Sequence, residues 1–344
     1  MEGLHRMKRG LGENHLSLRN TTCLKGILAI CIILCHLWGR IATASQHLTE
    51  RWIWHTIGRV CGSLGYLSVA LFFFVSGYGL AVQYKNKGEE YMRGFLQKRV
   101  LPLYVVSVCL VAFYSGVKVL FGEEILLVDI IQSFLFGGTL IKYGWYLQAI
   151  LLLYILFYLA FKWVKKDILQ ILIFASEFLL YLAICLLLKL GSTWYESAFC
   201  LVIGVVWGRF NERINTYLGQ KKLLAILTLL SLLLFGVTFI FGNFSFFGDG
   251  IRILIKCISA CSFAHLVVLL LRVIPIDNVV TYFLGKISLE IYALHGFALM
   301  LYRCKWVYVS NEILYSIFVI ATSIGLAFAI HPLFSMILKF GKKG

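Results

Sequence analysis

Charged residues, prolines and acidic residues are all scarce in this sequence. Only 14% of its 344 residues are charged and 3 are proline, whereas 60% are hydrophobic. A soluble globular domain of this length does not need so much apolar surface, so we expect an all-α, polytopic membrane protein. Because no long polar stretch interrupts the chain, residues 1–344 are expected to form one membrane domain, with residues 1–22 as a cytoplasmic segment.

The sequence also lacks a nucleic-acid-binding stripe and a cleavable signal segment. It carries 32 basic and 16 acidic residues, for a net charge of +16, but the basic residues lie in short connecting segments. This distribution is typical of membrane topology, so we expect a lipid bilayer and no nucleic acid as a partner. Arg6, Lys8 and Arg9 precede any apolar run, which indicates an uncleaved N-terminus in the cytoplasm.

The cysteines show no metal-ligand spacing, and we expect no metal site. Cysteines within apolar runs are typically small buried hydrophobes. Eight of the ten lie within or at the ends of such runs: Cys23, Cys31, Cys35, Cys109, Cys185, Cys200, Cys257 and Cys261.

About ten apolar stretches are long enough to cross a bilayer. If the N-terminus is cytoplasmic, the connections that return to that side carry most of the basic residues, as the positive-inside rule requires, and the C-terminus is cytoplasmic as well. Five basic residues oppose this trend: Arg40, Arg51, Arg59, Arg303 and Lys305. The predicted spans are 23–41, 62–84, 100–121, 143–161, 168–190, 194–210, 222–242, 251–272, 281–302 and 312–338.

The first predicted span carries one cation and one imidazole. Lys25 and His36 are separated by three helical turns, or about 16 Å, and project from the same helix face. An ionisable residue deep in hydrocarbon marks a functional site. His36 is therefore the candidate catalytic residue, and a helix-packing histidine is the alternative.

The ninth predicted span carries a second imidazole at a similar depth. Ser288, Tyr292 and His295 follow one another at i, i+4 and i+7, so they share one helix face. A polar stripe on a membrane helix faces a cavity or other helices rather than lipid. These three residues are expected to line a substrate site or to brace the helices.

The connection before the third span concentrates basic residues, among them Arg93, Lys98 and Arg99. The positive-inside rule explains such a cluster, but an anionic cofactor such as a nucleotide diphosphate would also use it, with Arg99 as the best candidate. Ser76 lies just before this connection, beside glycines that permit close backbone approach or ordinary tight helix packing.

Other polar and aromatic residues near span ends have two interpretations. Trp145 and Tyr146 open the fourth span, as belt anchors or as a platform for a sugar ring. Arg252 and Lys256 lie one turn apart, where snorkelling to headgroups is the simpler interpretation and acceptor binding the alternative. His265 is alone on an apolar face, which favours a structural role.

Taken together, these segments resemble the acyltransferase 3 family of integral-membrane acyltransferases. The matching pieces occur in the family's order over almost the whole chain: Lys25 with His36, Phe73 to Tyr78, Lys98 to Tyr104, Trp145 to Leu147, and Gly285 to His295.

The resemblance implies transfer of an acyl group, usually acetyl, from cytoplasmic acyl-CoA to a hydroxyl of a glycan or other surface molecule across the cell membrane. It also implies that His36 is catalytic and that the basic residues near the third span contact the donor. Family members often carry a second arginine three residues before the one matching Arg99. Here that position is Leu96, and Lys98 or Arg93 is the expected substitute.

The residues and the resemblance suggest the same mechanism. A neutral His36 would act as general base on the acceptor hydroxyl, because imidazole suits proton transfer near neutral pH. Lys25, nearer the cytoplasm, would contact the phosphates or pantetheine of the donor. A covalent acyl-histidine is a second route. The alternative from another functional class is a transporter or flippase of a polar lipid-linked sugar, although the sequence shows no internal repeat of the kind that transporters often have.

Overall fold

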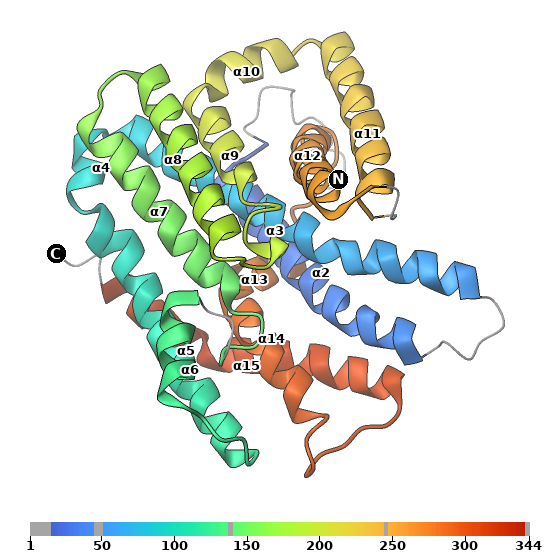
Figure 1. The fold of residues 1–344 in the computed structure, drawn as a ribbon. Coiled ribbons are helices and arrows are strands. Elements are labelled where there is room, and N and C mark those ends of the chain that lie inside the picture. Colours follow the sequence, from blue (N-terminus) through green and yellow to red (C-terminus); the bar gives the residue numbers. More distant parts are fainter. Residues whose placement is uncertain (1–14, 45–50, 137–139, 244–246, 341–344) are drawn as a thin grey trace, which may run out of the picture.

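The computed structural model describes residues 15–44, 51–136, 140–243 and 247–340. These residues form helices joined by short connections, with no β-sheet among them (Figure 1). The prediction of an all-α membrane protein is confirmed. The α-helices are α2 (Leu18–Ala44), α3 (Arg51–Lys87), α4 (Glu89–Arg93), α5 (Leu101–Leu120), α6 (Leu127–Phe136), α7 (Trp145–Trp163), α8 (Asp167–Leu187), α9 (Phe199–Arg209), α10 (Asn211–Leu218), α11 (Lys221–Asn243), α12 (Asp249–Leu270), α13 (Val279–Lys286), α14 (Ser288–Leu301) and α15 (Glu312–Phe340).

Eight helical segments within the described ranges are long and apolar enough to cross a membrane. Seven of them are α2, α3, α7, α8, α11, α12 and α15, and the eighth joins the π-helical turn η2 (Leu96–Val100) to α5. The pair α13 and α14 would be a ninth crossing, broken by a bend of 73°. Eight of the ten predicted spans therefore correspond to continuous helices, and two differ.

The predicted span at 194–210 is a short helix. The helix in this stretch, α9, has 11 residues, which at 1.5 Å per residue is about half of a hydrocarbon core. It lies against α3 with backbone touching backbone: a Cβ on Gly204 would be 2.1 Å from the Phe74 carbonyl oxygen, and one on Gly77 equally close to that of Leu201. Because α9 is mostly buried among other helices, it does not need to span the lipid on its own.

The predicted span at 281–302 is broken at Ile287, between α13 and α14. Gly285 meets α2 here, and a Cβ on it would be 1.9 Å from the Thr22 carbonyl oxygen. The Ser288 hydroxyl donates to the Gly285 carbonyl oxygen at 2.9 Å, which satisfies an acceptor that the break frees. The bend lets α14 leave α13 and carry its polar face toward the distal half of α2.

Connections predicted to share the cytoplasmic side do meet in the structure. Lys85 contacts Glu212 at 2.7 Å, Lys165 contacts Glu89 at 3.4 Å, and Arg209 pairs with Asp167. These pairs join the connections that follow the second, fourth and sixth predicted spans. The three connections therefore lie at one end of the helix bundle.

Candidate functional site

The two predicted imidazoles meet between α2 and α14. The ring centroids of His36 and His295 are 5.2 Å apart, with the planes 18° from parallel. The ring of Tyr143 stacks on His36 at 3.7 Å and lies 5.5 Å from His295. The prediction that both imidazoles lie at a similar depth is confirmed, and an aromatic side chain that sequence reasoning missed completes the cluster.

Tyr143 occupies an unusual backbone conformation just before α7. Its φ of 65° lies in the left-handed region, which non-glycine residues rarely adopt. The hydroxyl of Tyr292, on α14, donates a hydrogen bond to the Tyr143 carbonyl oxygen and fixes this turn. The strained turn directs the Tyr143 ring onto His36, as expected where a fold holds strain at a functional site.

His295 is oriented by the backbone of its own helix. Its Nδ1 lies 2.6 Å from the carbonyl oxygen of Tyr292, and because a carbonyl can only accept, Nδ1 carries the hydrogen. Nε2 is consequently the lone-pair nitrogen, and it has no hydrogen-bond partner among the described residues. The side chain is fully buried and lines neither of the two cavities described next.

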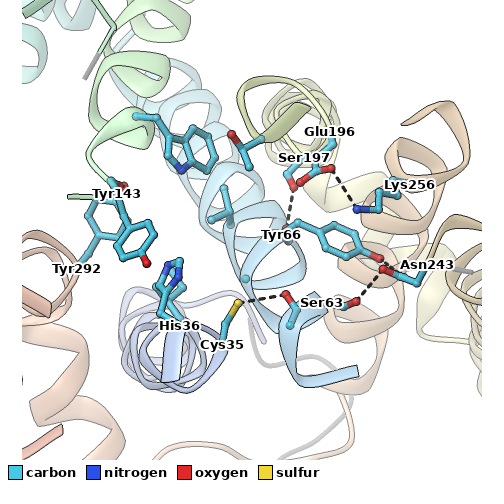
Figure 2. A pocket seen from close by; sticks show the side chains of 16 residues that line it. Cys35, His36, Ser63, Tyr66, Tyr143, Glu196, Ser197, Asn243, Lys256 and Tyr292 are labelled. Atoms are coloured by element: carbon cyan, nitrogen blue, oxygen red, sulfur yellow. Dashed lines mark hydrogen bonds and ion pairs between the residues drawn. The ribbon is translucent and has the colours of Figure 1, made fainter. Parts of the chain in front are cut away.

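His36 faces a cavity of about 360 Å³, the outer cavity. Figure 2 shows His36 and Tyr143 on one side of it, with Tyr66, Asn243 and Lys256 on the other. Cys35, which was expected to be simply buried, also lines it. The remaining lining residues are Ile32, Gly62, Ser63, Gly65, Val69, Trp145, Thr193, Glu196, Ser197 and Tyr292.

Lys25 faces a second cavity of about 210 Å³, the inner cavity. Ser76 lines it and shares hydrogen bonds with the hydroxyls of Tyr146 and Tyr154. Both tyrosines line the cavity as well, and its other lining residues are Ile32, Val69, Phe72, Leu103, Leu147, Ile150, Ser288, Leu289 and Tyr292. Ile32, Val69 and Tyr292 line both cavities, so the two adjoin at these side chains.

The predicted substrate-contacting residues divide between the two cavities. Trp145 lines the outer one, Tyr146 and Ser288 line the inner one, and Tyr292 lines both. His295 lines neither cavity and is buried beside the rings of His36 and Tyr143. The structure thus places four of the five in the lining of two adjoining cavities and the fifth, His295, behind the imidazole cluster; contact of each with a substrate stays a prediction.

Of the basic residues in the connection before α5, Arg99 lies near Lys25 of the inner cavity. Arg99, in the π-helical turn η2, interacts electrostatically with Lys25 and lies 5.8 Å from the Tyr91 ring centroid. Burial raises the pKa of Tyr91 to about 12, so this phenol stays neutral beside the cation. Lys98 and Arg93 are exposed, where they remain free to reach a soluble anion.

His265 lies apart from both cavities. Its Nδ1 is 2.7 Å from the Ser231 hydroxyl of α11, and its ring packs edge-on against Trp207. Both contacts agree with the interpretation of His265 as a structural residue. Arg252 pairs with Asp249 at 2.7 Å on an exposed face. Lys256, by contrast, lines the outer cavity, which favours the alternative of acceptor binding over snorkelling.

Sequence reasoning named Lys256 on the far wall of the outer cavity and missed its other polar residues. Glu196 is 5% exposed and pairs with Lys256, at an Nζ–Oε2 distance of 3.7 Å. A carboxylate at the start of a predicted span was a usable signal, because buried acids in membrane segments are costly and mark function. Tyr66 and Asn243 gave no such signal, since each also suits ordinary helix packing.

Comparison with known protein families gives a match over most of the chain. A family model described as an acyltransferase domain, Acyl_transf_3, matches residues 20–331. No curated protein and no solved structure matches the sequence. The matched region contains both cavities, the imidazole cluster and the basic connection before α5. The chain therefore belongs to the acyltransferase 3 family and is a multi-pass membrane acyltransferase.

Proposed function

We propose that this acyltransferase moves an acyl group, most simply acetyl, from cytoplasmic acyl-CoA to a hydroxyl of a cell-surface glycan or its precursor. The reaction takes place in the cell membrane, with His36 as the general base. The observation that carries the proposal is the pair of adjoining cavities, one lined by His36 and the other by Lys25. Two substrates that enter from opposite sides would meet where the cavities touch.

The inner cavity suits the donor. Lys25 lines it, Arg99 lies close enough to Lys25 to interact with it electrostatically, and Lys98 and Arg93 add exposed positive charge on the same connection as Arg99. Such residues bind phosphates through charge-assisted hydrogen bonds, as the diphosphate of CoA requires. The Ser76 hydroxyl and the apolar wall beyond it would accommodate the pantetheine arm, and the thioester would lie near Tyr292.

The outer cavity suits the acceptor. The His36 imidazole takes the proton of the acceptor hydroxyl as its oxygen attacks the thioester carbonyl carbon. The carbon–sulfur bond then breaks, and the imidazolium returns the proton to the CoA thiolate, so that atoms and charge balance. Tyr143 holds the His36 ring by stacking, and His295 supports this pair from the buried side.

Replacement of His36 tests the proposal. We expect His36→Ala to reduce acylation of surface glycans, followed by mass spectrometry, by at least about a hundredfold, the loss typical of a missing general base. His265→Ala is the matched control, because it removes a membrane histidine outside both cavities, and it should retain activity. Both variants are compared at equal membrane abundance.

Three outcomes have distinct meanings. Unchanged acylation in His36→Ala contradicts the role of this histidine. Movement of a glycolipid by the purified protein without consumption of acyl-CoA contradicts the transferase and favours a flippase. An acetyl group recovered on the His36 peptide after incubation with acetyl-CoA alone would replace general-base catalysis with the covalent acyl-histidine route.

A further inference from the structure

The wall of the outer cavity opposite the catalytic histidine is polar, and the transfer step itself does not use it. Tyr66 comes from α3, Glu196 from the connection before α9, Asn243 from the end of α11, and Lys256 from α12 (Figure 2). Four separate segments thus converge on one surface. Helix packing alone does not require polar side chains from each of them, so a ligand is the physical reason to consider.

Part of this wall is a chain of neutral hydrogen-bonding groups. The Ser63 hydroxyl donates to Asn243 Oδ1 at 2.8 Å, and Asn243 Nδ2 donates to the Tyr66 hydroxyl at 3.3 Å. The Tyr66 hydroxyl in turn lies 3.2 Å from that of Ser259. Hydroxyl and amide groups fixed in this way present both donors and acceptors, which is the chemistry that recognises another hydroxylated molecule.

The remainder of the wall consists of the Glu196 carboxylate and the Lys256 ammonium, which form a loose ion pair. Lys256 Nζ is 3.7 Å from Glu196 Oε2, which is longer than a direct hydrogen bond. The Ser192 hydroxyl donates to the same oxygen at 3.2 Å, so both contacts of the carboxylate fall on Oε2. A ligand hydroxyl can bridge the two charged groups or donate to Oε1.

The two charges cancel, so the cavity offers no net charge to an ionic ligand. We infer that the outer cavity is the binding site for an uncharged, hydroxyl-rich acceptor, a sugar ring or a polyol unit, held by Glu196 and Lys256. This inference rests on the proposed function. An anionic acceptor such as a uronic acid or a glycerol phosphate would bind less well, because the Glu196 carboxylate repels it and Lys256 only balances the charge of Glu196.

The size and aromatic lining of the cavity agree with a single ring. Its volume of about 360 Å³ lies at the small end of small-molecule sites, which span about 300–1,000 Å³. Trp145 adds an indole that can stack on the apolar face of a sugar. The cavity would therefore bind one sugar ring of the acceptor at a time, and the rest of any polymer would lie outside it.

The test measures acceptor kinetics of the full-length, detergent-purified protein with acetyl-CoA. The neutral probes are methyl α-glucopyranoside and glycerol, and the anionic probes are glucuronate and glycerol 3-phosphate. We expect the parent to acetylate a neutral probe in preference to its anionic partner. Glu196→Gln should raise KM for the neutral probe about tenfold, the loss expected for hydrogen bonds to a charged group, with KM for acetyl-CoA unchanged.

Reversal of the charge preference separates binding from a structural role. Glu196→Gln leaves Lys256 uncompensated, so the ratio of KM for the anionic probe to KM for the neutral probe should fall. Lys256→Met should raise that ratio. The matched control is Glu312→Gln. It removes an ion pair in which Glu312 and Arg303 are 2.5 Å apart and which lies outside the outer cavity, so it should alter KM for neither the neutral nor the anionic probe.

The outcomes distinguish this inference from the proposed function. A parent that releases no CoA with any probe contradicts the proposed function. A parent that acetylates only the anionic probes, or a Glu196→Gln variant with an unchanged KM and an unchanged charge preference, overturns the acceptor site alone. Equal effects in Glu312→Gln would also overturn it, because the response would then reflect general destabilisation.

Discussion

At the residue scale, the site depends on one strained turn. Tyr143 holds a left-handed φ of 65°, and the hydroxyl of Tyr292 bonds its carbonyl oxygen. This single hydrogen bond links α14 to the turn before α7 and thereby places a ring on His36. The stacking cluster is an assembly of three chain segments, and the hydrogen bond from Tyr292 joins two of them.

Removal of that hydrogen bond should affect catalysis. Tyr292→Phe removes this hydrogen bond from a partly buried carbonyl, which costs about 1–3 kcal/mol of stability, and loosens the Tyr143 turn. We expect kcat to fall about tenfold. The matched control is Tyr315→Phe, which removes a buried tyrosine bond of 3.0 Å to the Leu299 carbonyl. It should lower the thermal midpoint similarly and leave kcat intact, so equal kcat in the two variants would contradict this assignment.

His15 gives the fold a defined pH dependence at the predicted cytoplasmic end. Burial and the neighbouring Arg272 lower the pKa of His15 from its usual 6.5 to about 4, so the folded protein holds it neutral. The unfolded chain takes up this proton near pH 6.5. The stability contributed by neutral His15 is therefore complete above pH 6.5 and is lost as the pH falls toward 4.

The expected loss is on the order of 3 kcal/mol once His15 is fully protonated. Thermal midpoints of the purified protein measured from pH 7 to pH 4.5 should fall more steeply in the parent than in His15→Gln, which has no imidazole to titrate. Parallel pH profiles for the two proteins would show that this histidine does not control acid stability.

At the element scale, two close helix crossings shape the interior. α3 crosses α9 at Gly77 and Gly204, and α2 crosses α13 at Gly285. Each crossing places a glycine where a Cβ would overlap a carbonyl oxygen of the partner helix. Small residues permit such close approach. The van der Waals contact that results favours helix association, because lipid supplies no hydrophobic driving force between helices.

Substitution at a crossing should prevent folding. Gly204→Ala forces α9 away from α3, because its Cβ would lie 2.1 Å from backbone that cannot rotate aside. We expect little monodisperse protein after purification. Gly79→Ala, on α3 with nothing within 4 Å, is the matched control and should be neutral or stabilising by about 0.5–1 kcal/mol. Equal yields of the two variants would exclude the crossing as a structural requirement.

The sequence was informative about helices and less so about how they end. Long apolar runs and basic connections predicted eight continuous spans, because lipid imposes length and charge rules. The short α9 was missed although Gly204 and Gly208 form a small-xxx-small pattern, since hydropathy does not distinguish burial in protein from burial in lipid. The Tyr143 turn had no sequence signal, because its conformation depends on a bond to Tyr292, far away along the chain.

At the scale of the whole molecule, the fold brings two cavities together among its helices. α2 carries Lys25 in the inner one and His36 in the outer one, while Ile32, Val69 and Tyr292 separate them. Helices from both halves of the sequence line these two cavities, and the family match extends over the same residues. The molecule as a whole therefore holds two adjoining cavities that share three lining side chains.

Transfer across sided vesicles tests the central claim most directly. Inverted membrane vesicles expose the predicted cytoplasmic face to added acetyl-CoA, and methyl α-glucopyranoside is enclosed in the lumen. We predict that the parent deposits acetylated glucoside in the lumen and that His36→Ala deposits none. Lumenal product at the same rate in His36→Ala, or product only on the side of the acetyl-CoA, would contradict the account.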